Sequence, residues 1–123
     1  MEQKIIRGKR ILLVDDERSV REAFRMMLEL DDHIVTEANN GAEALDLLTK
    51  GQFDLVTTDF EMPGMKGNEL AVRIKKLAPK QPILMITAYG RELGDSENPV
   101  DGILNKPFML PDLREAVAKL LSQ

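Results

Sequence analysis

Short apolar runs alternate with amphipathic stretches along this chain. Residues 11–14 read Ile-Leu-Leu-Val without interruption, and such a run predicts a strand buried on both faces of a sheet. From Val20 onward, apolar residues recur at spacings of three and four, which predicts a helix with one packed side. The alternation continues to the end of the chain. We expect further strands at 33–37, 53–58, 82–87 and 103–105, and further helices from Asn40 to Gly51, around 70–77 and from Pro111.

Strands that alternate with helices predict an α/β fold. We expect an open five-stranded parallel sheet in the flavodoxin-like order 2-1-3-4-5, with helices on both faces. The segment 90–101 departs from this pattern, because its glycines, asparagine and proline leave room for only a short or irregular fourth helix. With 123 residues, the chain is expected to form a single domain spanning residues 1–123, without an output domain.

Polar residues stand where the predicted strands end. Asp15 and Asp16 follow the first strand, Asp59 follows the third, Thr87 ends the fourth, and Lys106 follows the fifth. In an open parallel sheet, ligands bind beyond the carboxyl ends of the strands. We therefore expect these five side chains to meet at one edge of the sheet.

The chemistry of this set points to a metal and a phosphoryl group. Three carboxylates close together repel one another, and a divalent cation relieves that repulsion. An all-oxygen site with open positions suits Mg²⁺ or Mn²⁺. Lys106 would add a positive charge and Thr87 a hydroxyl donor, so that the set could bind a tetrahedral anion beside a carboxylate nucleophile.

Each residue also has an ordinary structural explanation. An acidic pair after a strand can cap the next helix, and an aspartate ahead of a proline-containing loop can be a turn residue. A threonine or lysine at the end of a strand is common on protein surfaces. We favour a functional site because all of these residues occur together, each at the end of a strand.

Four segments together resemble the receiver-domain family of two-component signalling, over essentially the whole chain. "LLVDDE" at 12–17 resembles the acidic pair of the family, and "DLVTTDFEMPGMKGNEL" at 54–70 resembles its phosphoacceptor strand and loop. "PILMITAYG" at 82–90 resembles its hydroxyl-bearing strand, and "NKPF" at 105–108 its lysine–proline signature. Singly these motifs are weak to moderate signals, but four in register are specific.

The resemblance implies a role for each residue. Asp59 would be the phosphorylated aspartate, and Asp16 and Asp59 would bind the metal directly with the backbone carbonyl of Glu61. Asp15 would contribute to the metal site through water.

Thr87 would hydrogen-bond to the phosphoryl group and Lys106 would pair with it, with a cis peptide bond between Lys106 and Pro107. The donor would be a histidine kinase, a histidine phosphotransfer protein or a small phosphodonor. Dephosphorylation would reset the domain, which would act as a regulator and not as an enzyme on other substrates.

Several positions depart from the family pattern. Ile103 stands where an aromatic residue is common, and Tyr89 is the aromatic that could replace it. The side chain of Glu61 could place another carboxylate at the mouth of the site, and Lys66 stands where a helix-capping acid is usual, so the third helix is expected to begin late. The family docks kinases on the first helix. Several residues of this helix lie off its apolar stripe, and Met26 is a candidate apolar contact among them: Arg18, Arg21, Glu22, Arg25 and Met26.

Composition narrows the function further. The formal charge of −4 and the absence of a long basic run argue against direct nucleic-acid binding. The chain has no cysteine, which excludes disulfides and thiolate chemistry and fits a reducing compartment. No apolar run approaches the roughly 20 residues of a membrane helix, and the charged start lacks a signal-peptide pattern. We therefore expect a cytoplasmic protein that does not enter a membrane.

Three other functions remain open. A receiver fold that no longer cycles phosphate would act as a protein-interaction module, and the altered segment 90–101 with Ile103 leaves room for it. A dehalogenase-like phosphatase also uses an aspartate, Mg²⁺, threonine and lysine, but its D-x-D motif lies near the first strand and its cap domain would not fit here. A nucleotide-binding flavodoxin-like protein lacks support, because no glycine-rich loop follows the first strand.

Overall fold

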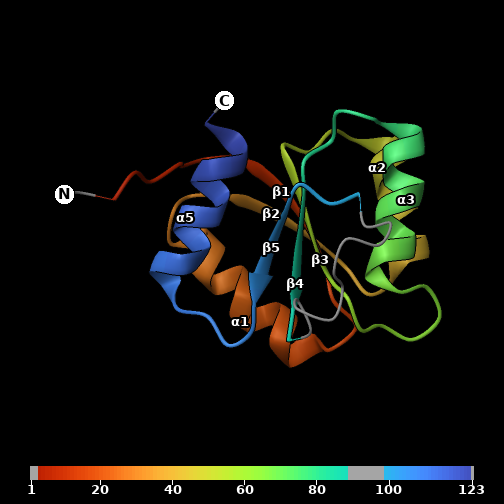
Figure 1. Ribbon diagram of the computed structural model, residues 1–123, viewed down its shortest axis with the longest axis horizontal. Coiled ribbons are helices and arrows are strands. Elements are labelled where there is room, and N and C mark those ends of the chain that lie inside the picture. The colour runs from red at the N-terminus through yellow and green to blue at the C-terminus, as the bar shows by residue number, and fades with distance from the viewer. Residues whose placement is uncertain (1–2, 89–98, 123) are drawn as a thin grey trace.

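One parallel sheet forms the centre of the computed structural model, which describes residues 3–88 and 99–122. Its strands lie in the order β2-β1-β3-β4-β5, as the sequence predicts (Figure 1). All four neighbouring pairs are parallel. The strands are β1 (Arg10–Val14), β2 (Ile34–Ala38), β3 (Leu55–Asp59), β4 (Ile83–Thr87) and β5 (Gly102–Asn105).

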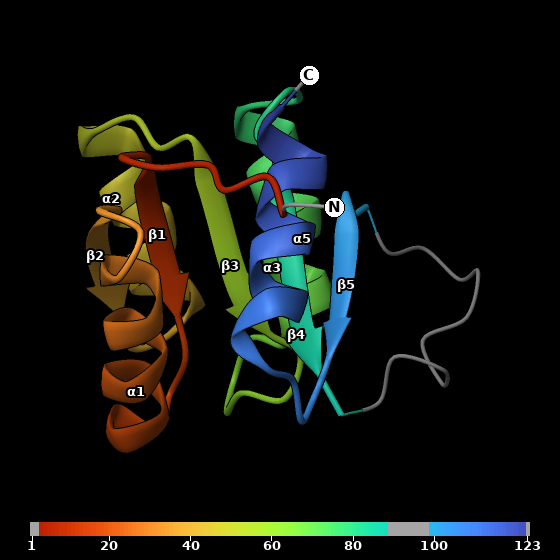
Figure 2. The ribbon, with the colours of Figure 1, turned by 90° about the vertical axis from the view of Figure 1, so that its left-hand side faces the viewer.

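The described helices cover the sheet on both faces. Helices α1 (Arg18–Glu29) and α5 (Leu110–Leu121) lie on one face, and α2 (Gly41–Lys50) and α3 (Gly67–Leu77) lie on the other (Figures 1 and 2). Within the described ranges, no helix is long and apolar enough to span a membrane. The predicted three-layer α/β architecture is confirmed.

Strand β1 divides its side chains between two cores. Ile11 and Leu13 pack with residues of α1 and α5, whereas Leu12 and Val14 pack with residues of α2 and α3. All four are at most 2% exposed, because a central strand in a parallel sheet is covered on both faces. The predicted continuous buried run is confirmed, and both cores are mainly aliphatic.

Helix α2 begins and ends where the sequence predicts. The Asn40 side chain accepts a hydrogen bond from the Glu43 backbone N–H, and Gly51 follows the last turn. The Glu43 carboxylate accepts from the Asn39 N–H at 2.7 Å, so the capping box closes one residue earlier than expected. Helix α3 begins after Lys66, which makes no side-chain cap, and Pro111 lies in the first turn of α5.

Two details of the sequence prediction are wrong. Leu77 belongs to the predicted apolar stripe of α3 but is 59% exposed at the end of that helix. Ala23 belongs to the stripe of α1 but is exposed. Tyr89 and most of the segment predicted to hold a short fourth helix lie outside the described residues.

Candidate functional site

The register of the sheet brings the carboxyl ends of four strands to one edge. Val14 lies opposite Thr58, Asp59 lies opposite Ile86, and Thr87 lies opposite Asn105. The residues that end these strands, or directly follow them, therefore share one edge, as the sequence predicts: Asp15, Asp16, Asp59, Thr87 and Lys106.

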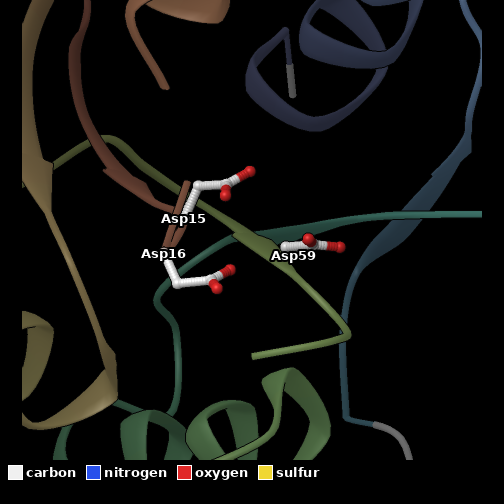
Figure 3. Close-up of side chains that lie close together, drawn as sticks. All are labelled: Asp15, Asp16 and Asp59. Atoms are coloured by element: carbon white, nitrogen blue, oxygen red, sulfur yellow. The ribbon is translucent and has the colours of Figure 1, made fainter. Parts of the chain in front are cut away.

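Three carboxylates from this edge form a cluster. Asp15, Asp16 and Asp59 each offer one oxygen, and these oxygens all lie within 4.8 Å of one another. Figure 3 shows the three side chains grouped at the ends of β1 and β3. Asp15 is buried, Asp59 is half-buried and Asp16 is exposed, so the cluster has a closed side and an open side.

The backbone around Asp15 is held by several hydrogen bonds. Its N–H donates to the Ala38 carbonyl at 3.1 Å, and its carboxylate accepts from the Glu17 N–H at 2.9 Å. Glu17 is the N-cap residue of α1 and makes no side-chain cap, so neither acid of the pair caps this helix directly. The helix-capping explanation of the acidic pair is therefore wrong.

Burial and charge both act on Asp15. Burial raises the pKa of this carboxyl above its ordinary value, and the nearby charges of Asp59 and Asp16 raise it further. The hydrogen bond from Glu17 and the charge of Lys106 act in the opposite direction. Burial is the largest cause of the raised pKa of Asp15, and the two neighbouring carboxylates add to it.

Lys106 supplies the positive charge of the site. Its Nζ lies 3.3 Å from Oδ2 of Asp59, and its backbone N–H donates to the Thr87 carbonyl at 2.9 Å. Thr87 is buried at the end of β4, and the Lys106–Pro107 peptide bond is cis, as the family resemblance implies. One lysine facing three carboxylates leaves two negative charges, which is the charge that one divalent cation neutralises.

The loop after β3 packs closely against Asp59. A Cβ at Gly67 would lie 3.0 Å from the Phe60 Cα and still closer to the Asp59 carbonyl oxygen, so only glycine fits at the start of α3. The Gly67 N–H donates to the Phe60 carbonyl at 2.9 Å and closes this loop. The sequence analysis did not identify Gly67 as important for the site. The one signal that could have done so is the presence of a glycine at the start of a helix.

The carboxylate of Glu61 does not join the cluster. It pairs with the Lys66 ammonium at 2.9 Å, and both side chains are half-exposed. The acid groups gathered among the described residues are those of Asp15, Asp16 and Asp59 alone. The Glu61 side chain is thus held by a lysine from the start of α3 at the mouth of the site.

Arg21 is the site residue that sequence reasoning placed differently. We expected it on the open face of α1, but its side chain is only 11% exposed. It donates to the Asp15 carbonyl at 2.8 Å and to the Glu37 carboxylate at 2.9 Å. Periodicity could not reveal this, because a long arginine side chain can turn toward partners on other elements.

Met26 is 69% exposed and does lie on the open face of α1, as the sequence predicts.

Proteins with similar sequences include a response regulator receiver protein. The response regulator receiver protein CpdR of Brucella abortus is 39% identical over 116 residues, which cover 92% of this chain and 97% of CpdR. The matched region therefore extends over nearly the full length of both proteins.

Solved structures give the same result. The response regulator TrrA of Thermotoga maritima, crystallised with Mg²⁺-BeF, superposes with a TM-score of 0.86 at 39% identity, covering 92% of this chain and 99% of TrrA. TrrA in complex with the histidine kinase ThkA gives a TM-score of 0.85 at 39% identity, covering 92% of this chain and 98% of that TrrA chain. The fold and the order of its strands are those of the receiver structures.

The family model of the response regulator receiver domain matches residues 11–118, which include β1 from Ile11 onward, the four other strands, every described helix start and the whole acidic cluster. This chain therefore belongs to the response regulator receiver domain family.

Proposed function

We propose that this protein accepts a phosphoryl group on Asp59 from the phosphohistidine of a histidine kinase or phosphotransfer protein, in a reaction that depends on Mg²⁺. The convergence of Asp15, Asp16 and Asp59 beside Lys106 carries the proposal. Its fit to a divalent cation rests on the donor set, which is all oxygen, and on the three carboxylate oxygens that lie within 4.8 Å of one another.

In the transfer step, a carboxylate oxygen of Asp59 forms a bond to phosphorus while the phosphorus–nitrogen bond of the donor breaks. The donor imidazole keeps the electron pair of that bond and takes a proton from solvent. Lys106, which pairs with Asp59 at rest, would turn to a phosphoryl oxygen, and the Thr87 hydroxyl would donate to another. Hydrolysis of the acyl phosphate would then release inorganic phosphate and restore Asp59.

The metal would be held by the carboxylates of Asp16 and Asp59 and by the backbone carbonyl of Glu61, with Asp15 contributing through water. Bound Mg²⁺ neutralises charge on the transferring group. Mn²⁺ would satisfy the same oxygen donors. The Mg²⁺-BeF complex of the similar protein TrrA supports this role.

A kinase partner is supported by the crystal structure of TrrA with the histidine kinase ThkA. In this chain, the exposed Met26 on α1 offers an apolar contact for such a partner. Regulation by phosphorylation, without turnover of an external substrate, is the function that this arrangement supports best.

The test is intact-mass measurement after incubation with a small acyl-phosphate donor and Mg²⁺. We expect one added phosphoryl group, which is lost in Asp59→Asn and in the presence of a chelator. Asp16→Asn should need far more Mg²⁺ for the same yield. Asp46→Asn is the matched control, because Asp46 is an exposed acid on α2 that pairs only with Lys50 among the described residues.

Absence of an adduct with every donor and metal would contradict the proposal and favour an interaction module that does not cycle phosphate. Repeated turnover of a phosphomonoester would contradict it in another way, by favouring a phosphatase.

A further inference from the structure

The side chain of Arg21 connects three elements beneath the acidic pair. It extends from the first turns of α1, its Nη1 donates to the Asp15 carbonyl at 2.8 Å, and its Nε donates to Glu37 on β2 at 2.9 Å. Only 11% of the Arg21 side chain is exposed, so water has little access to the guanidinium. Its hydrogen bonds are stronger here than in water, because few water molecules compete for the same groups.

The carbonyl that Arg21 holds belongs to the peptide group between Asp15 and Asp16. Because a peptide group is planar, fixing this oxygen also fixes the orientation of the Asp16 N–H and Cα. The hydrogen bonds of Asp15 to Ala38 and Glu17 lie on the other side of Asp15 or on its side chain. Among these contacts, the hydrogen bond from Arg21 is therefore the one that holds the peptide group between Asp15 and Asp16.

Asp16 depends on this link more than Asp15 does. Its side chain is exposed and makes no hydrogen bond to any residue in 3–88 or 99–122. The Asp15 carboxylate, by contrast, is buried and bonded to the Glu17 N–H. The backbone therefore sets the position and direction from which the Asp16 side chain starts, and no hydrogen bond or ion pair among these residues holds its carboxylate further.

Glu37 holds the guanidinium in place. Its two carboxylate oxygens accept from Arg21 at 2.9 Å and from Arg25 at 2.7 Å. A planar guanidinium can donate in two fixed directions at once, toward Glu37 and toward the Asp15 carbonyl. A lysine ammonium is a flexible point charge and cannot reproduce this fork.

We propose that Arg21 is a positioning residue for the metal site: anchored by Glu37, it orients the Asp15–Asp16 peptide group so that both carboxylates face Asp59. The inference rests on the proposed metal-dependent function, because it concerns the same carboxylates. Groups that orient metal ligands from behind commonly change metal affinity by about 10- to 100-fold when removed.

The experiment is a direct Mg²⁺ titration of the purified protein by calorimetry, without any phosphodonor. In Arg21→Gln we expect the Mg²⁺ dissociation constant to rise about tenfold or more. Arg21→Lys should not restore it, since the fork is lost although the charge remains. Arg18→Gln is the matched control, because Arg18 lies on the same helix with an exposed side chain paired to Glu22, and its dissociation constant should stay unchanged.

A second measurement, the phosphorylation rate at saturating Mg²⁺, separates a positioning role from a general loss of structure. If Arg21 acts through the metal site, the phosphorylation rate of Arg21→Gln should return close to that of the wild type at saturating Mg²⁺, so that the defect lies in the Mg²⁺ requirement. Glu37→Gln keeps Arg21 but weakens its anchor, and it should raise the dissociation constant in the same direction by a smaller factor. This variant provides the test if Arg21→Gln does not fold.

The outcomes distinguish this inference from the proposed function. If Arg21→Gln folds and binds Mg²⁺ with wild-type affinity, the positioning role is overturned and the proposed function is left intact. If only Glu37→Gln folds, an unchanged Mg²⁺ affinity in that variant has the same consequence. A wild-type protein that binds Mg²⁺ but acquires no phosphoryl group would overturn the proposed function and leave the positioning role standing. A wild-type protein without Mg²⁺ affinity would overturn both.

Discussion

The Lys106 ammonium lies 3.3 Å from the Asp59 carboxylate, and both residues lie at the carboxyl ends of strands, one directly after β5 and one at the end of β3. Strand β4 separates β3 from β5, so the lysine must reach across the end of β4 to meet Asp59. The pair joins the phosphoacceptor candidate to the one basic side chain that, among the described residues, forms an ion pair with a carboxylate of the cluster.

Lys106→Met should slow phosphorylation of Asp59 about 100- to 1,000-fold, because a positive charge that would stabilise the transferring phosphoryl group is removed. The binding of Mg²⁺ should not weaken, since the lysine competes with the cation for the same carboxylate. The measurements are the rate of mass gain with an acyl-phosphate donor and the Mg²⁺ dissociation constant. Lys119→Met, on an exposed part of α5, is the control, and equal rates in both variants would contradict the role of Lys106.

Gly67→Ala should lower the free energy of unfolding by about 1–3 kcal/mol, because the added methyl group would overlap the Asp59 carbonyl and the Phe60 backbone. Phosphorylation should slow as well, since the backbone of the acceptor residue has to shift. Gly51→Ala is the matched control. Gly51 has an extended backbone, and a Cβ added there would meet only the Arg10 Nη2, at 4.0 Å. Chemical denaturation measures both variants, and a loss as large in Gly51→Ala would refute the steric explanation.

Thr57→Val should raise the free energy of unfolding by about 1 kcal/mol. The Thr57 hydroxyl is fully buried and has no hydrogen-bond partner among the described residues, and such a group costs about 1–3 kcal/mol. Thr58→Val is the control on the next residue, because that hydroxyl donates to the Asp59 carbonyl at 3.0 Å. Denaturant unfolding should find Thr57→Val more stable than Thr58→Val, and the reverse order would show that the Thr57 hydroxyl is satisfied.

The strand ends could be predicted from the sequence because they follow from a simple periodic pattern. A buried run must stop where the chain leaves the sheet, and parallel strands all stop on the same side. For this reason the acids at 15, 16 and 59 and the lysine at 106 were found together without knowledge of the fold. Helix starts were predicted to within a residue or two where a capping side chain marked them, as at Asn40.

The partners of long polar side chains could not be predicted in this way. Position on a helix says which way a Cβ points, but a guanidinium or ammonium several bonds away takes its place from groups on other elements. Arg21 turned to Glu37 and the Asp15 carbonyl, and Lys66 turned to Glu61. The exposed end of α3 at Leu77 escaped prediction for a related reason, since periodicity does not say how far the neighbouring elements extend.

His33 joins the start of β2 to the segment before β1. It is 5% exposed, and its Nδ1 accepts a hydrogen bond from the Lys9 N–H at 3.0 Å. Burial lowers the pKa of His33 below its ordinary value, although the charges of Asp31 and Asp32 oppose this change. The acceptor nitrogen must be unprotonated, so this contact requires the neutral ring.

Stability should therefore fall as the pH drops below about 6.5, the ordinary pKa of histidine, because the unfolded chain takes up a proton that the folded chain refuses. The slope cannot exceed about 1.4 kcal/mol per pH unit for one group, and it should vanish below the folded pKa, where both states are protonated. His33 is the only histidine of the chain, so His33→Asn, which keeps an acceptor without a titrating ring, should remove this dependence between pH 5.5 and 7.5. Urea unfolding at several pH values measures it, and an identical slope in the variant would assign the effect to other groups.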